Sequence, residues 1–527
     1  MTREYLYYAL SAVLTTYIVW TAAETYLSLT RTIYPTPLHH ITRSSLAALL
    51  IPIAMALYNE AKYLSKMRTH NCSPCPVYLH SEPILGLDWL RLSLKALESN
   101  TLLETWQSTF KRVGNTFWVK AMGKWILMTN DPQNLKAILS TSFDDWPVAG
   151  PRLDAVLPIL GPDSIFSSNG AKWHDSRAMM RPAFVRNQIA DLACFERHVG
   201  RLLDIIPKNG ETVDLQDLFY RMTMDSATDF MFGYSTNMLT DPSPEAVEFC
   251  KMFDYVNARS ATRARLGIMA LLDRDKKFAE GLRIVHQFVD NYVEKVRAEK
   301  KTPERGYVFL NEMMDSERSP LYIRSQLLSL ILAGRDTTAG VLSSLFWVLA
   351  RRPDVVKDLR KEILELDDRS PTWEVMKNLK YLNMVLKEAL RLYAPVATMS
   401  RSAVRDTILP VGGGRDGTSP LFVPKGTAAR WSLYSMQRRE DLFGPDAEEF
   451  RPERWNDLRV LWEYVPFSGG PRICIGQQFA LVQMSYVLVR LFQMFEGIEA
   501  RDDRPMRHDM AITTKLANDL WVGLKKA

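Results

Sequence analysis

The sequence predicts a mainly α-helical protein of the α+β class, with small β-sheets and an N-terminal membrane anchor. Three observations lead to this prediction. Apolar residues recur at three- and four-residue spacing through most of the chain, which is the period of amphipathic helices. Strand-like runs are few and short. The first 23 residues contain a long apolar run without charge.

The composition is that of a large globular protein. The chain has 527 residues, and 66 Lys and Arg against 60 Asp and Glu give a net charge of +6. Hydrophobic residues make up 47% and charged residues 24%, which excludes a disordered or fibrous chain. The small, dispersed positive excess does not indicate nucleic-acid binding and fits a membrane surface or an acidic protein partner better. A chain of this length can enclose a cofactor in its core.

Five cysteines are too few and too scattered to form a disulfide scaffold. Cys72 and Cys75 have the spacing of half a zinc site or of a redox pair, but no second Cys pair or close His pair completes it. Pro74 and Pro76 make this stretch more typical of a stiff hinge.

The N-terminus is predicted to be a membrane anchor over residues 1–68. Residues 5–23 are uncharged and close to the roughly 20 residues that cross a bilayer. A cleaved signal peptide is the alternative, disfavoured by the length of the run and by the single Arg3 before it. The second apolar run, 44–59, contains Pro52, and whether it spans the membrane stays open. The positively charged residues that follow this run predict that the rest of the chain lies on the cytosolic side of the membrane.

After this anchor we predict a Pro-containing linker over residues 69–88 and a catalytic domain over residues 89–527. Helical periodicity covers residues 186–206, 245–257, 277–299, 321–350, 353–366 and 376–393. Strands are expected at 116–119 and 124–128, with further pieces between 396 and 431.

The most informative stretch is a glycine-rich loop with one cysteine, at residues 467–480, which leads into an apolar helix over 479–494. Backbone N–H groups and a helix N-terminus beside Cys474 would stabilise a thiolate, and Arg472 offers a cation nearby. Gly470 and Gly476 would let the backbone lie against a large planar group. A buried free cysteine is usually only a small apolar residue, but this spacing argues against that reading.

This loop resembles the haem-ligand loop of the cytochrome P450 family, Phe-x-x-Gly-x-Arg-x-Cys-x-Gly. Every fixed position is matched, by Phe467, Gly470, Arg472, Cys474 and Gly476. The resemblance covers roughly residues 71–520 and implies the cytochrome P450 fold, with heme b bound through an iron coordinated by the Cys474 thiolate.

The family's oxygen-activation motif is matched by residues 333–338, in the middle of a long apolar helix. Gly, Asp and Thr are poor helix-interior residues, so we expect a local opening of the helix there. The resemblance implies that Asp336 and Thr337 are catalytic residues that relay protons to bound dioxygen.

Two further motifs match the family in the expected order. Glu388 and Arg391 share one helical face, and Arg454 matches the arginine that completes a buried structural network with them, although Trp455 stands where Phe is more common. Trp173 and Arg177 also share a face and match the pair that reaches a haem propionate. Arg401 matches another propionate-binding position, with Arg472 as a further partner.

The resemblance implies an NADPH-dependent monooxygenase at the endoplasmic reticulum membrane, with its catalytic domain on the cytosolic side. NADPH–cytochrome P450 reductase is the expected electron donor, and cytochrome b5 stays open as an additional one. An acidic reductase would dock on a basic surface near Arg472, to which Arg351, Arg352, Lys357, Arg438 and Arg439 are candidate contributors.

The substrate is expected to be an apolar small molecule. The segments 170–184 and 470–480 are most similar to the fungal branch that contains alkane and fatty-acid hydroxylases, while similar fungal chains oxidise polyketide or terpenoid intermediates of secondary metabolism. Both substrate classes stay open. The loop 143–168 is expected to line the pocket with apolar side chains, namely Phe143, Trp146, Leu153, Val156, Leu157 and Ile159.

Two functions of other classes also stay open. The same haem-thiolate fold can serve an isomerase or dehydratase that needs no external oxygen, although the intact Asp336–Thr337 pair argues against it. The other is a non-catalytic haem- or lipid-binding membrane protein, which has no need of a proton-relay motif.

Overall fold

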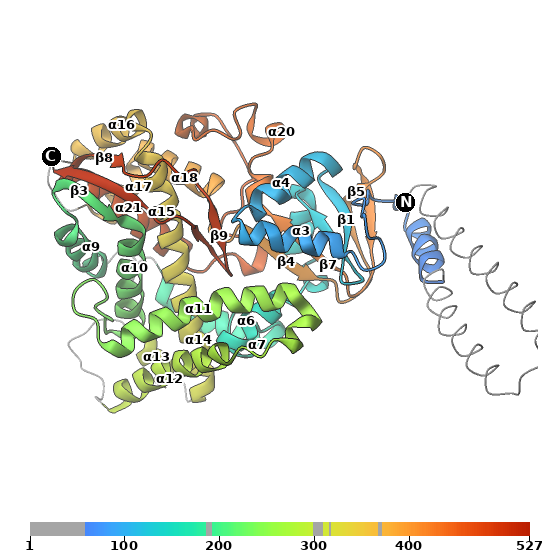
Figure 1. Cartoon of the computed structure of the whole chain (residues 1–527), viewed down its shortest axis with the longest axis horizontal. Helices are drawn as coiled ribbons and strands as arrows, with labels where there is room; N and C mark the ends of the chain where they lie inside the picture. Colours follow the sequence, from blue (N-terminus) through green and yellow to red (C-terminus); the bar gives the residue numbers. More distant parts are fainter. Residues whose placement is uncertain (1–57, 186–191, 299–308, 316–317, 367–370, 527) are drawn as a thin grey trace, which may run out of the picture.

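Most of the described chain is helical, with one four-stranded sheet and three smaller sheets beside the helices (Figure 1). This computed structural model describes residues 58–185, 192–298, 309–315, 318–366 and 371–526. The prediction of a mainly helical protein with small sheets is therefore confirmed.

The helices are α3 (Leu87–Glu98), α4 (Leu102–Val113), α5 (Pro132–Lys136), α6 (Pro151–Leu160), α7 (Gly170–Met180), α9 (Ala193–Ile205), α10 (Leu215–Phe232), α11 (Pro244–Leu266), α12 (Lys276–Ala298), α13 (Phe309–Asp315), α14 (Pro320–Ile331), α15 (Thr337–Leu349), α16 (Pro353–Leu364), α17 (Trp373–Asn378), α18 (Lys380–Leu392), α19 (Leu433–Met436), α20 (Glu440–Phe443) and α21 (Gln477–Met494). All six predicted helical segments contain helices. The segment 376–393 is divided because Leu379 is extended, with φ −69° and ψ 101°.

The long apolar helix of the middle of the chain has an irregular centre. A π-helical turn, η5 (Leu332–Asp336), joins α14 to α15. Gly334 and Asp336 are poor helix formers, and a π turn is where such a helix opens. The expected local opening is therefore present.

The larger sheet has the strand order β1 (Thr116–Ala121), β2 (Lys124–Thr129), β7 (Ala428–Ser432) and β4 (Thr398–Ser402). β2 and β7 run parallel, and the other neighbours are antiparallel. The hairpin of β5 (Thr407–Gly413) and β6 (Ser419–Val423) lies nearby in sequence. These strands confirm the two predicted strand regions.

Two sheets built mainly from strands near the C-terminus were not predicted. One has the order β3 (Asn209–Asp214), β11 (Trp521–Lys526) and β8 (Phe495–Ala500), and the other pairs β9 (His508–Met510) with β10 (Thr514–Leu516). Asp214 pairs with Trp521, so this contact joins positions about 300 residues apart.

The core is divided between the helices and the sheet. One apolar cluster lies among α9, α10, α15, α16, α18 and α21, and a second joins α6, α7, α10, α11, α12 and α14. Two smaller clusters cover the two faces of the four-stranded sheet. The functional cavity described below takes its walls from both the helices and the sheet.

Residues 1–57, which hold nearly all of the predicted anchor, lie outside the described residues. None of the helices in the described part of the chain is both long and apolar enough to cross a bilayer. Residues 58–69 are helical, and the predicted linker is irregular but attached to the sheet, since the Trp118 N–H donates to the Pro76 carbonyl over 2.9 Å.

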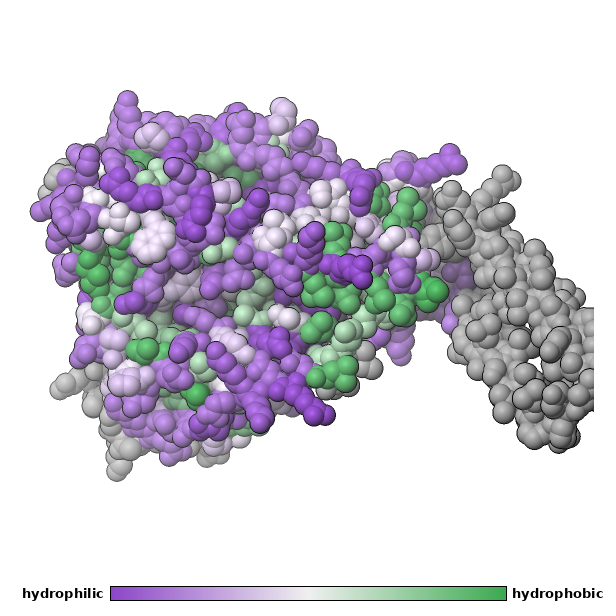
Figure 2. Space-filling view, in the orientation of Figure 1, coloured by the Kyte–Doolittle hydropathy of each residue, from purple (hydrophilic) through white to green (hydrophobic). Residues whose placement is uncertain are grey.

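The end of the molecule near residue 58 carries a concentration of exposed apolar side chains (Figure 2). Those with large exposed fractions include Leu79, Ile84, Leu85, Leu87 and Trp125. Clustered apolar exposure of this kind is typical of a surface that contacts a membrane or another protein.

Candidate functional site

One cavity brings together most of the site residues predicted from the sequence. Its walls come from α6, α7, the helix α14–η5–α15, the segment before β4, the cysteine loop and the start of α21. The predicted residues that line it are Trp173, Arg177, Thr337, Arg401, Phe467, Arg472, Cys474 and Gly476. Gly470 and Asp336 are absent from this wall, and so are Glu388, Arg391 and Arg454.

Cys474 presents its thiol to this cavity. The loop is held by a hydrogen bond from the Cys474 N–H to the Phe467 carbonyl over 3.0 Å, and Gly476 caps the N-terminus of α21. Burial raises the pKa of the Cys474 thiol, whereas the Gly476 N–H and the Arg177 guanidinium act to lower it. A cation bound in the cavity would therefore be needed to hold the sulfur as a thiolate.

The structure shows a reason for Gly470 that the sequence does not indicate. Gly470 has φ +65°, and a Cβ there would lie 1.9 Å from the Leu139 carbonyl oxygen. It is required by the close approach of the loop to the Ala137–Thr141 turn, η1. A Cβ at Gly476 would meet the Phe184 ring at 3.4 Å, so Gly476 faces the cavity wall with a tight neighbour.

Four arginines line the cavity without an acidic partner. They are Arg152, Arg177, Arg401 and Arg472. Within the described residues no ion pair joins any of them to a carboxylate; Arg472 instead donates to the Ser168 carbonyl over 2.7 Å and stacks on Trp173 at 4.5 Å. Arg152 was not among the predicted site residues, because it belongs to no motif of fixed spacing. Its position in the loop 143–168, which was expected to line the pocket, is the only sequence signal for it.

The four arginines make this part of the cavity strongly electropositive. Burial lowers the pKa of Arg401 to about 9 and that of Arg472 to about 10, and in both cases the positive charge of Arg152 lowers it further. The Nε of Arg472 is buried without a hydrogen-bond partner. Buried cations that repel one another around a cavity are stabilised by an anionic ligand, and two haem propionates supply that charge.

The oxygen-motif helix forms another wall of the same cavity. Thr337 lines the cavity and its hydroxyl donates to the Ala333 carbonyl over 2.5 Å. Asp336 is buried behind this wall, where it accepts a hydrogen bond from Arg335 over 2.9 Å. Burial raises the pKa of Asp336, which keeps the carboxyl close to the range in which it can exchange protons near neutral pH.

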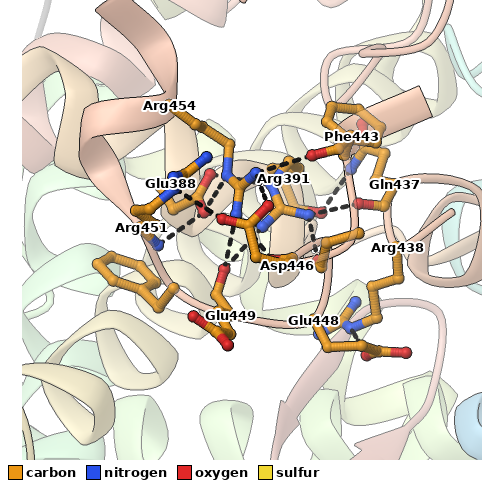
Figure 3. A network of polar contacts seen from close by, with 12 residues as sticks. Glu388, Arg391, Gln437, Arg438, Phe443, Asp446, Glu448, Glu449, Arg451 and Arg454 are labelled. Carbon is orange, nitrogen blue, oxygen red and sulfur yellow. Dashed lines mark hydrogen bonds and ion pairs between the residues drawn. The ribbon is translucent and has the colours of Figure 1, made fainter. Parts of the chain in front are cut away.

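The predicted structural network is present (Figure 3), and its three residues Glu388, Arg391 and Arg454 are buried. Glu388 accepts from Arg391 over 2.8 and 2.9 Å and from the Arg454 Nε over 2.8 Å. The indole N–H of Trp455 donates to the same carboxylate over 3.0 Å, which gives a reason for a Trp where Phe is more common. The network ties α18 to the segment that precedes the cysteine loop.

The apolar lining expected from the loop 143–168 is present only in part. Of the apolar side chains expected from the loop 143–168, only Val156 lines the cavity, together with Val148, Ile165 and Phe166. Trp146, which precedes α6, is buried in the core beside the sheet. Within α6, Ile159 is buried in the helical core and Leu157 is 39% exposed, because the helix turns these two side chains away from the cavity.

The basic patches expected to receive a reductase are largely occupied by internal contacts. Arg438 is buried and stacks on Tyr434 at 3.6 Å, and Arg439 donates to the Asn130 carbonyl over 2.9 Å. Arg351 stacks on Trp347 at 3.8 Å.

Cys72 and Cys75 are buried free thiols that donate to backbone carbonyls, in agreement with a structural role.

The fold and the cavity define a helical protein with a cysteine-bearing cofactor site. Residues 85–519 match the family model described as Cytochrome P450. The chain is 41% identical over 495 residues to cytochrome P450 monooxygenase himC of Aspergillus japonicus, covering 91% of this chain and 89% of that protein. It is 42% identical over 462 residues to cytochrome P450 52A13 of Debaryomyces hansenii, covering 83% of this chain and 88% of that protein.

The chain therefore belongs to the cytochrome P450 family, whose members are haem-thiolate enzymes with the iron coordinated by a cysteine. A third similar protein, cytochrome P450 monooxygenase fsdH of Fusarium heterosporum, is 38% identical over 476 residues, covering 87% of this chain and 84% of that protein. The names of these relatives support monooxygenase activity for this chain.

Proposed function

We propose that this chain oxidises an apolar small molecule with O2, using electrons that NADPH supplies through cytochrome P450 reductase at the endoplasmic reticulum membrane. The observation that carries the proposal is one cavity walled by Cys474, by Thr337 and by four arginines without acidic partners. When bound, the haem supplies the oxygen-activating redox chemistry.

The residues of this chain have separate roles in the proposal. Cys474 would be the thiolate ligand of the iron, and Arg152, Arg177, Arg401 and Arg472 with Trp173 would hold the propionates. Thr337 would hold a proton donor at the cavity wall, and Asp336 would renew that proton from behind it. Phe467 and Gly476 would form part of the wall around the sulfur.

The substrate side of the cavity is apolar. Phe166, Leu330, Val341, Val396 and Ile512 are among its lining residues. Such a wall suits either expected class, a long-chain fatty acid or alkane, or a polyketide or terpenoid intermediate of fungal secondary metabolism. The similarity of residues 170–184 to the alkane- and fatty-acid-hydroxylase branch supports the first class.

The exposed apolar residues around α3 support an enzyme that is associated with a membrane. They lie at the end of the molecule near residue 58, where the described chain begins after the predicted anchor. A haem-thiolate isomerase or dehydratase is less well supported, since Thr337 lines the cavity and Arg335 holds Asp336 directly behind it. A non-catalytic haem-binding protein would leave this pair without a role.

The direct test uses the full-length chain in microsomes with the reductase. We expect NADPH-dependent consumption of O2 and a product that carries one oxygen atom from isotopically labelled O2. Conversion of substrate without reductase or O2 would contradict the proposal in favour of an isomerase or dehydratase.

A further inference from the structure

A cysteine, a histidine and an aspartate meet where α9 packs against α10, outside the cavity described above. Cys194 and His198 are four residues apart on α9, so both side chains lie on one face of the helix. Asp229 lies in the last turn of α10. The ligand atoms of the three side chains all lie within 4.8 Å of one another, and none of the three residues lines the cavity. The cluster is thus a candidate site for a metal ion.

The distances between these atoms are close to those of a tetrahedral zinc site. Bonds of about 2.3 Å from zinc to sulfur and of about 2.0–2.2 Å to nitrogen or oxygen place neighbouring ligand atoms roughly 3.4–3.6 Å apart. The Cys194 Sγ lies 3.8 Å from the Asp229 Oδ2. The His198 Nε2 lies 2.9 Å from the same oxygen, and these two atoms would have to separate by roughly 0.5 Å to coordinate zinc. Small rotations of the side chains are enough for that change.

The ring of His198 is directed at this cluster. Its side chain has no accessible surface, and its Nε2 atom contacts Asp229. Among the described residues the Nδ1 atom has no hydrogen-bond partner, so the contact at Nε2 is the polar contact that orients the ring. A buried imidazole that presents one nitrogen to a thiol and a carboxylate has the arrangement of a metal ligand.

The surroundings of Asp229 favour a bound cation. The last turn of α10 carries the negative end of the helix dipole. The Ser226 carbonyl lies 3.7 Å from the Cys194 Sγ and adds a further electronegative atom. Burial raises the pKa of Asp229, but the hydrogen bond with His198 and the charge of Arg197 bring it below its ordinary value, so the carboxylate is ionised at neutral pH.

Arg197 already places a cation against Asp229. Its Nη1 atom donates to the same Oδ2 atom that a metal ion would use. The Arg197 side chain is 51% exposed, and an ion pair of such an exposed arginine contributes little to stability because water competes for both charges. The guanidinium can therefore turn to solvent when a metal ion takes its place.

We infer from this geometry that Cys194, His198 and Asp229 bind a zinc ion, with a water molecule as the fourth ligand. Thiolate sulfur, imidazole nitrogen and carboxylate oxygen are the three donor types that zinc uses, and four ligands in a tetrahedron are its usual arrangement. Mg²⁺ and Ca²⁺ are disfavoured because they take oxygen ligands. On binding, the Cys194 thiol releases its proton to solvent and its sulfur becomes a ligand.

The zinc ion would join α9 to the part of α10 that borders the cavity. Phe230 and Met231 follow Asp229 directly in the chain, and both line the cavity. Cys194 and Asp229 are partly exposed, so the fourth position is open to water. The site is separate from Cys474, and zinc here would hold the cavity wall in place without taking part in the chemistry at the haem.

The test measures the zinc bound by the full-length, haem-loaded protein, purified without a histidine tag and dialysed against a zinc buffer. The carbon monoxide difference spectrum of each sample confirms that Cys474 is occupied by haem and does not bind zinc. We expect about one zinc ion per haem, and X-ray absorption at the zinc edge should show about one sulfur at about 2.3 Å, with nitrogen and oxygen at about 2.0–2.2 Å. Magnesium in excess should leave the zinc in place.

Substitution of the ligands should remove the zinc. Cys194→Ala and Asp229→Asn should each weaken zinc binding by more than about tenfold, a loss that even changes around the ligands can cause. Arg197→Gln should instead strengthen binding by about two- to fivefold, because it removes the cation that competes for Asp229. Cys72→Ala is the matched control, because Cys72 is a buried cysteine outside the cluster.

Wild-type protein that binds no zinc would overturn the inference. Equal zinc content in the wild type, Cys194→Ala and Asp229→Asn would overturn it as well, and a zinc shell without sulfur would show that the ion is bound elsewhere. Arg197→Gln separates a metal site from a purely structural cluster, because loss of an ion pair within a structural cluster would not raise the affinity for zinc. Unchanged zinc binding in this variant would contradict the shared use of Asp229.

Discussion

The guanidinium of Arg335 donates to the carboxylate of Asp336, its neighbour in the chain, with 2.9 Å between Nη1 and Oδ1. Its Nη2 also donates to Asp254 of α11 over 3.1 Å. Arg335 is buried and Asp254 is about half exposed, with 48% of its side chain accessible. One arginine thus joins the buried acid of the oxygen motif to a carboxylate at the protein surface.

Removal of Asp254 should change the pH dependence of proton delivery. Burial raises the pKa of Asp336 to about 6, and the negative charge of Asp254 raises it, while Arg335 lowers it. Tyr220, Cys250, Asp225, Asp509 and Lys515 are further titratable groups around this cluster, and Asp254 is the one of the acids that pairs with Arg335 beside Asp336. Asp254→Asn should therefore lower the pKa of Asp336.

The sign of the effect on activity follows from the role of Asp336. Above its pKa the carboxyl is mostly ionised and holds no proton to pass on, so product formed per NADPH should fall as pH rises through that pKa. In Asp254→Asn the fall should occur at lower pH. The control is Glu248→Gln, an exposed acid on the same helix. An unchanged pH profile in Asp254→Asn would contradict this coupling.

Thr337→Ala should uncouple the enzyme. Thr337 and Thr338 are the two hydroxyl-bearing residues of the motif that line the cavity, and Thr337→Ala removes the one that the motif assigns to proton delivery. We expect product per NADPH to fall by about tenfold or more, with the missing electrons recovered as hydrogen peroxide. Thr337→Ser, which keeps a hydroxyl, should retain most of the coupling. Equal coupling in the Ala variant and the wild type would rule out this role.

Arg152→Gln should weaken haem retention. Arg152 lines the cavity and repels Arg401 and Arg472, so it belongs to the same electropositive cluster. Loss of a charge-assisted contact costs about 1.5–3 kcal/mol, which corresponds to haem release at least about tenfold faster. Transfer of haem to apomyoglobin measures this rate. Arg181→Gln, at an exposed arginine outside the cavity wall, should leave it unchanged.

Trp455→Phe should destabilise the protein slightly and Glu388→Gln strongly. The Phe variant loses one buried hydrogen bond to Glu388, a cost of about 1 kcal/mol. The Gln variant leaves Arg391 and Arg454 without their shared buried carboxylate, a cost of about 3–5 kcal/mol. Urea unfolding of the haem-loaded protein measures both, with the partly exposed Trp521→Phe as control. Equal stability of Trp455→Phe and Trp521→Phe would contradict a role for the indole N–H.

Periodicity and motif spacing predicted the elements whose signal is local. The helices α11, α12 and α16 follow their apolar spacing, and the hairpin of β1 and β2 follows from two short adjacent runs. β3 was missed because Asn209–Asp214 is mostly polar and contains no buried residue, and its partner β11 lies at the C-terminal end of the described chain. No local sequence pattern indicates that two strands so far apart in the chain pair with each other.

The site was predicted where a fixed spacing marks it and missed where only the fold brings residues together. Cys474, Trp173 and Arg177 lie in recognisable motifs, and the structure places all three at one cavity. Arg152 belongs to no motif, and the structure assigns it to the site because it lines the cavity beside three other arginines. The close approach of Gly470 to Leu139 could not be predicted, because the two residues lie far apart in the sequence.

The most direct test of the central claim is the carbon monoxide difference spectrum of reduced microsomes that contain the Cys474→Ala variant. We predict that this variant loses the thiolate-type band of the wild type while the protein is still expressed and associated with the membrane. Cys194→Ala, a cysteine that is not among the cavity-lining residues, should keep the band. A normal thiolate band in Cys474→Ala would show that another residue holds the iron and would contradict the assignment on which the proposed function rests.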